Sequence, residues 1–323
     1  MKIYLGIDIG SVTTKFAALD EKGGMIANNY LPTRGMPIEM VQKGLTEIKS
    51  RLPEEAEISG VATTGSARYL AGVIVNADLV KNEITSHATA ALHYYPEART
   101  IIEIGGQDSK IIILRDGVAI DFGMNTVCAA GTGSFLDHQA LRLNMDIGEF
   151  SRRAILSKTP VHIAGRCTVF AESDMIHKQQ MGHITEDILY GLCQALVRNY
   201  LNNVGMGREI KAPIIFQGGV AFNQAIVKAF EEELGIEVIV PPHHEVMGAI
   251  GAALLVREAM SGGKKTGFRG FGVSDIKYHS SSFECKACAN LCEIAQIANN
   301  GHVLARWGGR CDRWERVSSE EEK

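Results

Sequence analysis

Short apolar runs separated by glycine-containing turns open the chain. Two such runs flank the turn Gly10-Ser11-Val12-Thr13 and predict a β-hairpin. The expected elements of this region are strands at 2–9, 14–19, 24–30 and 58–63 and helices over 39–51, 66–75 and 83–94. Strands therefore come first and then alternate with helices, a pattern typical of an α/β protein.

The start of this pattern is repeated 95 residues further along the chain. Ile7-Asp8-Ile9-Gly10 followed by Thr14-Lys15 corresponds to Ile102-Glu103-Ile104-Gly105 followed by Ser109-Lys110. The repeat preserves an acid, a glycine, a hydroxyl, a lysine and the apolar strand after the lysine, in the same order. We interpret it as a duplicated β-hairpin core, in which two related α/β halves face one another across a cleft, a usual location for a ligand.

Beyond the repeat, helices and short strands are predicted. Helices are expected to begin near 133 and 168 and to run over 184–203, and strands are expected at 212–216 and 237–240. The first of these strands runs into Gln217-Gly218-Gly219-Val220, and the small residues of 248–253 allow a helix to approach its neighbour closely. Residues 261–272 contain five glycines and are predicted to form a linker.

Composition and charge narrow the classes of function. The net charge is −4 and 22% of the residues are charged, so no broad basic field indicates a nucleic-acid partner. The longest apolar run, 247–256, is about half as long as a membrane span requires, and Asp8 interrupts the N-terminus before a signal-peptide core could form. We therefore expect a cytoplasmic protein that binds neither nucleic acid nor membrane. Seven cysteines are an odd number, which disfavours a disulfide framework and favours reduced thiols that bind a metal or a cluster.

The segment 6–15 has the chemistry of a phosphate-binding hairpin. Its glycine turn lets backbone amides point at phosphate oxygens, and hydroxyl groups and Lys15 add donors. It is not a Walker A loop, because the second glycine before the lysine is missing and a hairpin replaces the strand-loop-helix. Asp8 suits Mg²⁺ through the water shell of the ion. One such turn is more often only a turn, but its repetition at 103–108 favours two hairpins that embrace one nucleotide.

Gly218-Gly219 follows an apolar strand, and taken alone it is equally consistent with a tight turn into a helix. Beside two phosphate hairpins, it becomes a candidate contact for the base and ribose.

At this point the sequence resembles known proteins. The two hairpins and the Gln217–Val220 segment are similar to the nucleotide fold of acetate and sugar kinases, actin and chaperone ATPases. Two further segments, 125–133 and 164–173, each contain a cysteine. They resemble the ATP-dependent activators of 2-hydroxyacyl-CoA dehydratases, a family that includes benzoyl-CoA reductase ATPase subunits. The likeness covers residues 1–260 and implies an α/β chain with a duplicated actin-like ATPase fold.

The resemblance, together with the chemistry of the hairpins, assigns roles to two sets of residues. Catalysis of ATP hydrolysis with Mg²⁺ is expected to involve Asp8, Glu103, Gln107 and Asp108. ATP or ADP is expected to contact Gly10, Ser11, Val12, Thr13, Thr14, Lys15, Gly105, Gly106, Gly131, Thr132, Gly133, Gly218, Gly219, Val220 and Gly248. Glu103 departs from the aspartate expected in most relatives. The longer carboxylate can still hold a metal-bound water, but it leaves the role of Glu103 in hydrolysis open.

Cys128 and Cys167 are the candidate cluster ligands. A [4Fe-4S] cluster normally takes four thiolates, so a two-fold axis through the cluster would let two subunits supply two each. Both cysteines precede predicted helices, whose positive ends would offset the charge of an anionic cluster. The alternative is that they are small buried hydrophobic residues, as Cys193 is expected to be from its place on an apolar helix stripe. The resemblance implies a bridging cluster in an oxygen-sensitive homodimer.

A second cysteine set lies in the C-terminal tail. Cys285, Cys288, Cys292 and Cys311 form a four-thiolate pattern, and too few apolar residues lie between Phe283 and Trp314 for a self-supporting core. A bound metal is therefore expected, either Zn²⁺ or a second iron-sulfur cluster, with structural zinc the commoner use. The expected organisation is an actin-like subdomain at 1–95, a second at 96–260 whose last helix packs back on the first, a glycine-rich linker at 261–282 and the four-cysteine tail at 283–323.

These features predict an ATP-driven electron-transfer protein. ATP hydrolysis would change how two subunits present the bridging cluster to an iron-sulfur acceptor of the dehydratase or reductase type, with a ferredoxin or flavodoxin as electron donor. The main alternative is a sugar or acid kinase with structural cysteines, for which Glu103 or Asp108 could serve as the base. A nucleotide-dependent binding protein without chemistry of its own is a third possibility.

Overall fold

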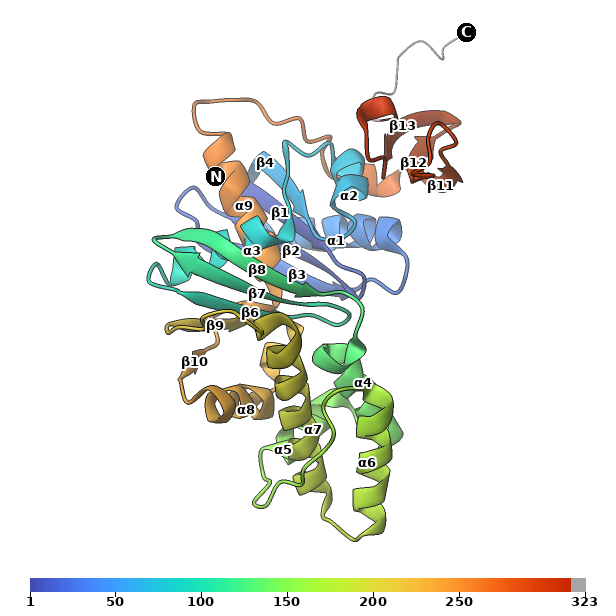
Figure 1. Ribbon diagram of the computed structural model, residues 1–323. Coiled ribbons are helices and arrows are strands. Elements are labelled where there is room, and N and C mark those ends of the chain that lie inside the picture. Colours follow the sequence, from blue (N-terminus) through green and yellow to red (C-terminus); the bar gives the residue numbers. More distant parts are fainter. Residues whose placement is uncertain (315–323) are drawn as a thin grey trace. The chain divides into compact units, whose positions relative to one another are not determined.

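The chain is described over residues 1–314 by a computed structural model (Figure 1), and these residues fold into two units. Among the described residues, the first unit contains 1–82 and 252–314, and the second is Glu83–Gly251. Each unit has its own five-stranded sheet and its own hydrophobic core. Each can therefore be described by itself.

The first unit is built on a mixed sheet. Its strands are β1 (Lys2–Ile9), β2 (Thr13–Leu19), β3 (Met25–Pro32), β4 (Glu57–Thr64) and β5 (Leu79–Val80), in the order β3-β2-β1-β4-β5. The β1-β2-β3 part is antiparallel, whereas β4 and β5 join in parallel. Seven of the eight residues of β1 are buried, which explains why this central strand is apolar on both faces.

Two helices accompany this sheet, α1 (Pro37–Arg51) and α2 (Arg68–Val75). Pro37 lies at the start of α1, where its missing N–H costs no helical hydrogen bond. Val41, Leu45 and Ile48 recur at helical spacing and are fully buried. Gly44 lies against Phe16 of β2, where a Cβ atom would overlap the ring. The absence of a side chain at Gly44 therefore lets α1 pack closely on the sheet.

The second unit has the corresponding sheet. Its strands are β6 (Thr100–Ile104), β7 (Ser109–Arg115), β8 (Val118–Asn125), β9 (Ile214–Gln217) and β10 (Val238–Ile239), in the order β10-β9-β6-β7-β8. Its longer helices are α3 (Glu83–Tyr94), α4 (Gly133–Arg142), α5 (Ile147–Ala154), α6 (Thr168–Gln180), α7 (Thr185–Tyr200) and α8 (Gln224–Leu234). Short helical turns are η1 (Ala129–Gly131), η2 (Leu201–Gly205), η3 (Gly219–Phe222) and η4 (His244–Val246).

The predicted duplication of the hairpin is confirmed by the strand pairing. In the first hairpin Asp8 is opposite Lys15, and in the second Glu103 is opposite Lys110. Read from β3 to β5 and from β8 to β10, the two sheets have the same succession of antiparallel and parallel neighbours. The helices expected near 133 and 168 are present as α4 and α6. The helix expected over 184–203 corresponds to α7 and its continuation η2.

The chain passes from the second unit to the first within α9 (Met247–Ala259). Its C-terminal half belongs to an apolar cluster of the first unit that contains Tyr4, Ala62, Ala252, Val256 and Met260. Gly60 of β4 faces Val256 and Met260 without a side chain, so the helix and the strand approach closely. Among residues 1–314, none of the helices has the length and apolar character that a membrane crossing requires.

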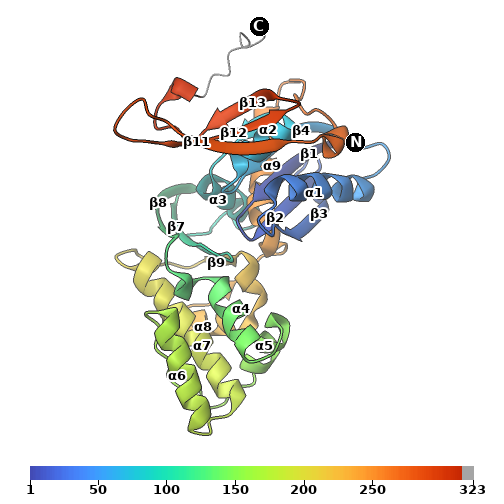
Figure 2. The same ribbon diagram turned by 90° about the vertical axis from the view of Figure 1, so that its right-hand side faces the viewer.

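The C-terminal tail forms a small separate sheet. Its strands are β11 (His279–Glu284), β12 (Glu293–Asn299) and β13 (His302–Trp307), and they pair antiparallel in this order. The tail lies beside α2 in both views (Figure 2), and Ile297 of β12 is fully buried in the core of the first unit. The preceding segment is also attached, because Thr266 Oγ1 and Gly267 N each donate to the Asp78 carboxylate at 2.7 Å.

Candidate functional site

The hairpin turn of the first unit is closed by its own hydrogen bonds. Gly10 N donates to Thr13 O at 2.9 Å, and Thr33, just beyond β3, donates from its hydroxyl to Gly10 O at 2.9 Å. The hydroxyls of Thr33 and Thr14 also lie 2.9 Å apart in a buried position. Ser11 is exposed at the tip of the turn, beside the half-buried Val12 and Thr13. Thr33 was not predicted to be a site residue, because its contribution depends on the pairing of β2 with β3.

Asp8 is held at the end of β1. Its side chain is almost fully buried, and Lys15 Nζ contacts Asp8 Oδ2 at 3.0 Å. Gly65, which follows β4, has a φ of +94°, and a Cβ atom there would lie 2.6 Å from Asp8 Oδ1. Only glycine combines this backbone angle with such a close approach. The carboxylate is therefore fixed by β1, β2 and the β4 turn together.

The hairpin of the second unit contains a denser charge cluster. Lys110 Nζ contacts carboxylate oxygens of Glu83 at 2.8 Å, Glu103 at 3.0 Å and Asp108 at 3.0 Å. Burial by itself lowers the pKa of Lys110, but the three carboxylates outweigh burial and hold that pKa above its usual range. Three carboxylates against one ammonium leave an excess of negative charge. That excess suits a divalent cation such as Mg²⁺.

The predicted glycines of the second unit are brought together around this hairpin. Gly133 N, at the start of α4, donates to Gly105 O at 2.8 Å, and Ser134 N donates to Gly106 O at 2.8 Å. A Cβ atom on Gly133 would lie 3.0 Å from both Gly105 O and Val220 Cγ2. The start of α4, the hairpin turn and the segment after β9 therefore meet at one place.

Gly218 completes this cluster. Its φ is +95°, and a Cβ atom there would lie 2.9 Å from Glu103 Oε1. His244 is joined to it, because Gly218 N donates to His244 O at 2.9 Å and His244 Nδ1 lies 3.1 Å from Gly218 O. His244 also packs edge-on against the exposed Phe222, with ring centres 4.3 Å apart. The sequence placed His243 and His244 in a polar loop expected near the nucleotide, whereas Phe222 was not predicted to belong to the site.

The remaining predicted residues lie close in sequence to these groups. Gln107 is exposed in the turn of the second hairpin, and Thr132 is fully buried directly before α4. Gly219 begins η3, and Gly248 is buried in the first turn of α9. Asp8, Gly10 and residues 11–15 belong to the first unit, whereas all the others around the hairpins belong to the second.

Cys128 and Cys167 lie on two loops that are linked inside the second unit. Asn125 holds the first loop, because its side-chain oxygen accepts from Cys128 N at 2.9 Å and its side-chain nitrogen donates to Cys128 O at 2.7 Å. Asn199 of α7 holds the second loop by donating to Gly165 O at 2.6 Å. Gly131 lies between the two asparagines, and a Cβ atom there would be 2.8 Å from Asn199 Oδ1 and 3.4 Å from Asn125 Nδ2. The two cysteine loops therefore share one support.

Both cysteines precede helical turns, as predicted. Cys128 directly precedes η1, and Cys167 is the residue before α6, which runs for 13 residues. Each is half-buried. Apolar side chains beside them are exposed: Val127 at 95%, and Val169 and Phe170 at 66% each. Cys193, by contrast, is fully buried within α7, and burial raises the pKa of its thiol.

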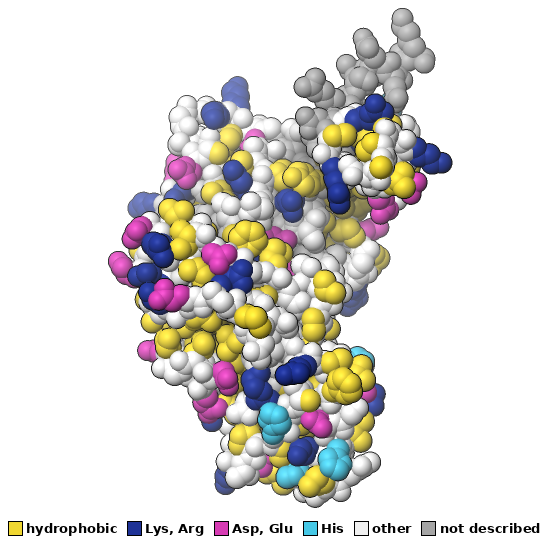
Figure 3. Space-filling view, viewed as in Figure 1, with side chains coloured by type: hydrophobic (Ala, Val, Ile, Leu, Met, Phe, Trp, Pro, Cys, Tyr) yellow, Lys and Arg dark blue, Asp and Glu magenta, His cyan; other side chains and the backbone are white. Residues whose placement is uncertain are grey.

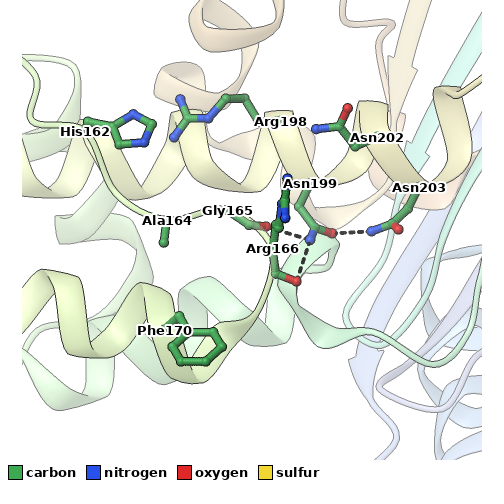
Figure 4. Close-up of a pocket in the computed structure, with 9 residues that line it drawn as sticks. All are labelled: His162, Ala164, Gly165, Arg166, Phe170, Arg198, Asn199, Asn202 and Asn203. Carbon is green, nitrogen blue, oxygen red and sulfur yellow. Dashed lines mark hydrogen bonds between the residues drawn. The ribbon is translucent and has the colours of Figure 1, made fainter.

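A cavity of about 690 Å³ opens beside the second cysteine loop (Figure 4). Phe170 of α6 lines one side, Arg198 and Asn199 of α7 line another, and the loop through Gly165 and Arg166 crosses between them. Asn203 donates to Asn199 at 2.8 Å, so the supporting asparagine is itself oriented. This polar lining was not predicted from the sequence, because its two groups of residues lie about thirty positions apart and meet only through the packing of α7.

The tail cysteines lie around one end of the tail sheet. Cys285 is buried, Cys292 is half-buried, and Cys288 and Cys311 are exposed. Trp314 Nε1 donates to Cys285 Sγ at 3.2 Å, and this bond together with one from the Ala287 backbone lowers the pKa of the Cys285 thiol. Within the described residues, no group of three or more histidine, cysteine or carboxylate side chains is arranged to hold a metal ion.

Comparison with known proteins identifies the family and the fold. The sequence profile of the BadF/BadG/BcrA/BcrD ATPase family matches residues 5–256. The (R)-2-hydroxyglutaryl-CoA dehydratase activating ATPase of Acidaminococcus fermentans is 33% identical over 260 residues, which are 79% of this chain and 97% of that protein. The solved structure of the activator of the 2-hydroxyisocaproyl-CoA dehydratase from Clostridium difficile, with bound ADPNP, has a TM-score of 0.71 at 33% identity and covers 80% of this chain and 95% of that one.

A more distant likeness concerns the fold alone. A ROK family glucokinase from Streptomyces griseus has a TM-score of 0.50 at 12% identity and covers 79% of this chain and 99% of that one. The actin-like ATPase fold with mixed α/β sheets, which the resemblance implied, is confirmed. The tail adds a small separate sheet to this fold.

Proposed function

Because the chain belongs to the BadF/BadG/BcrA/BcrD ATPase family, we propose that it is an ATP-dependent activator that donates low-potential electrons. Its acceptor would be an iron-sulfur enzyme of the 2-hydroxyacyl-CoA dehydratase type or a related reductase. Two copies of the chain would share one [4Fe-4S] cluster, and a ferredoxin or flavodoxin would supply the electrons. The relatives named above as dehydratase activators support this assignment.

The observation that carries the proposal is the common support of the two cysteine loops. Asn125, Gly131 and Asn199 hold Cys128 and Cys167 on adjacent loops of one chain, each at the start of a helical segment. Two thiols are half of the four that a [4Fe-4S] cluster normally takes, so a second copy must supply the other two. The exposed Val127, Val169 and Phe170 provide the apolar surface that such a subunit contact buries.

The nucleotide would be held by the hairpins. In the first unit the amides and hydroxyls around Gly10 and Ser11, with Lys15, are phosphate donors, and Asp8 is a carboxylate for the hydration shell of Mg²⁺. In the second unit Glu103 and Asp108 add negative charge, and the start of α4 directs its amides toward the same hairpin. A bound Mg²⁺ would neutralise phosphate charge.

Coupling between the nucleotide and the cysteines has a direct path within the second unit. The hairpin turn bonds to Gly133, and the residues just before Gly133 include Gly131, which lies against both loop-supporting asparagines. A change in the hairpin on loss of the γ-phosphate would therefore shift the start of α4 and with it both cysteine loops. ATP can drive such a shift only through different affinities for the two arrangements.

The test is to measure the iron and sulfide content and the oligomeric state of protein purified without oxygen. We expect about four iron and four sulfide per two chains. Cys128→Ala and Cys167→Ala should each lose the iron and weaken the dimer in sedimentation. Cys193→Ala should retain both properties, because Cys193 lies in the core of α7.

A small-molecule kinase would give a different result. It would contain no iron and would transfer the γ-phosphate to a sugar or acid, with no protein acceptor reduced. Iron-free protein with such a transfer activity would reject the electron-transfer proposal.

A further inference from the structure

The four tail cysteines are the chemistry that the proposed function leaves unused, and the family match ends before them, at residue 256. The strand pairing brings them to one end of the tail sheet. Cys285 follows the last residue of β11, Cys292 precedes the first residue of β12, and Cys311 lies beyond the end of β13. Because β11 and β13 both run antiparallel to β12, the last residues of β11, the first residues of β12 and the last residues of β13 lie at the same end of the sheet.

Hydrogen bonds and close contacts hold together the segments that carry the four tail cysteines. Cys285 N donates to Cys292 O at 2.8 Å, which joins the two strand ends. Leu291 has a φ of +43°, and its N–H donates to Cys288 O at 3.3 Å, so a tight turn carries Cys288 back toward Cys292. A Cβ atom on Gly309 would lie 2.9 Å from Cys311 O and 3.6 Å from Ile294 Cδ1. The segment that carries Cys311 therefore lies against the start of β12.

Apolar packing at this end is thin. Ile294 and Ile297 are the tail side chains with no exposed surface among the described residues, and Ile297 packs into the core of the first unit. The cysteine end has Ile294 and the edge-on pair of Phe283 with Trp314, whose ring centres are 5.0 Å apart. Such a small apolar cluster is less than an independent end of a sheet usually needs, and a structural metal is the common addition.

We propose that this end of the tail binds one Zn²⁺ through Cys285, Cys288, Cys292 and Cys311. Four thiolates and one Zn²⁺ carry a net charge of about −2. Acidic and basic residues both neighbour the ligands in sequence, among them Glu284, Lys286, Glu293 and Arg310, and the visible surface of the tail carries charged side chains of both signs beside apolar ones (Figure 3). The four side chains are not grouped around a metal position in the described residues, so binding requires the exposed Cys288 and Cys311 to change their side-chain conformation. Zinc suits a structural site of four thiolates, because it binds four such ligands in a tetrahedral arrangement and does not change its oxidation state.

The test compares two pairs of cysteines in the full-length chain. Protein purified without oxygen should contain about one zinc per chain. The double variant Cys288→Ser with Cys311→Ser should lose the zinc and keep its iron, whereas Cys128→Ser with Cys167→Ser should lose the iron and keep the zinc. The second pair thus separates failure of the zinc site from failure of the proposed function. Zinc content that is absent, or unchanged by the tail substitutions, would overturn the proposal, as would loss of iron and sulfide from the tail variant.

A spectroscopic measurement covers the case in which the tail variant does not fold. The Cys128→Ser, Cys167→Ser chain, which lacks the interfering absorption of the cluster, would be stripped of zinc and titrated with Co²⁺. Thiolate-to-cobalt charge-transfer bands and tetrahedral d–d bands, reaching a plateau at one Co²⁺ per chain, support a four-thiolate site. Octahedral spectra alone would reject it.

Discussion

At the scale of single residues, the most consequential group is Lys110. It is almost fully buried and contacts three carboxylates, so it holds together residues from α3, β6 and the hairpin turn. The corresponding Lys15 contacts Asp8 and is more exposed. The two hairpins are therefore alike in strand register but differ in how strongly the lysine stabilises each of them.

Replacing this cation should destabilise the second unit. Lys110→Met leaves three carboxylates close together without their buried counter-charge, and we expect a loss of about 3–5 kcal/mol in the free energy of unfolding at neutral pH. Urea denaturation measures the loss. Lys43→Met is the matched control, since Lys43 is 56% exposed and its pair with Glu47 should be worth less than about 1 kcal/mol. A loss equal to that of the control would contradict the structural role of Lys110.

Asp187, at the start of α7, is expected to make the stability of the protein depend on pH. Burial raises its pKa, but bonds from Ser157, from the Lys158 backbone and from Thr159 outweigh burial and lower the pKa to about 2. The folded-state pKa lies below the unfolded value of about 3.9. The charged carboxylate therefore contributes about 2–3 kcal/mol to the free energy of unfolding at pH values above about 3.9, and this contribution is lost as the pH falls toward 2.

Asp187→Asn should therefore be less stable than the natural chain at pH 7, and the difference should shrink between about pH 4 and pH 2. Denaturant unfolding at several pH values measures both stabilities. Asp116→Asn, in an exposed turn, serves as the control and should show no such convergence. A stability difference that stays constant over this pH range would show that the Asp187 charge is not responsible.

At the scale of elements, the tail sheet contributes to the core of the first unit. Ile297 of β12 has no exposed surface and belongs to the same apolar cluster as Val41 of α1 and Val75 of α2. Gln42 of α1 also donates to Ile276 O at 2.6 Å, so the segment before β11 is held to the same helix. Removing the tail would therefore uncover apolar surface on α1 and α2.

The measurable consequence is that a substitution in the tail destabilises the first unit. Ile297→Ala should lower the free energy of unfolding by about 2–5 kcal/mol, the range for an aliphatic side chain cut back in a core. Ile120→Ala is the control, because Ile120 of β8 is 50% exposed and its loss creates no enclosed cavity. Hydrogen exchange can localise the effect. Unchanged protection of the α1 amides in Ile297→Ala would refute the shared core.

At the scale of the whole molecule, the proposed ATP hydrolysis and electron transfer would use different residues, so the structure would have to couple them. Gly133 is the residue where the second hairpin meets the helix that follows the first cysteine loop. A methyl group there would lie 3.0 Å from Gly105 O and Val220 Cγ2, tighter than ordinary packing. Overpacking of this kind costs about 1–3 kcal/mol.

Gly133→Ala is expected to raise the KM for ATP about tenfold, since each 1.4 kcal/mol corresponds to roughly a factor of ten. At saturating ATP it should still hydrolyse ATP but transfer fewer electrons to the acceptor per ATP, because the hairpin no longer moves with the cysteine loop. Stopped-flow reduction of the acceptor, measured beside phosphate release, gives this ratio. Gly272→Ala is the control, because a Cβ atom there meets nothing within 4 Å. It should leave the KM for ATP and the number of electrons transferred per ATP unchanged. An unaltered ratio in Gly133→Ala would argue against this path of coupling.

The sequence by itself determined the duplicated hairpins, because short apolar runs on either side of a glycine-containing turn are local properties of the chain. The 95-residue repeat predicted two related hairpins, and the strand pairing then places Asp8 opposite Lys15 and Glu103 opposite Lys110. The helices that follow Cys128 and Cys167 were also predictable, since short loops and helical periodicity mark where they begin. These features depend on residues within about twenty positions of one another.

Only the tertiary structure decided which distant residues meet. Asn199 supports the Cys167 loop from α7, Thr33 closes the first turn from beyond β3, and Ile297 of the tail enters the core of the first unit. The strand β8 was not predicted, and its apolar Val118, Ile120 and Phe122 are at least half exposed. Such contacts arise from the packing of one element on another, which single-residue chemistry and spacing do not specify. The physical reason is that burial depends on which faces meet in three dimensions, whereas sequence patterns define only the faces themselves.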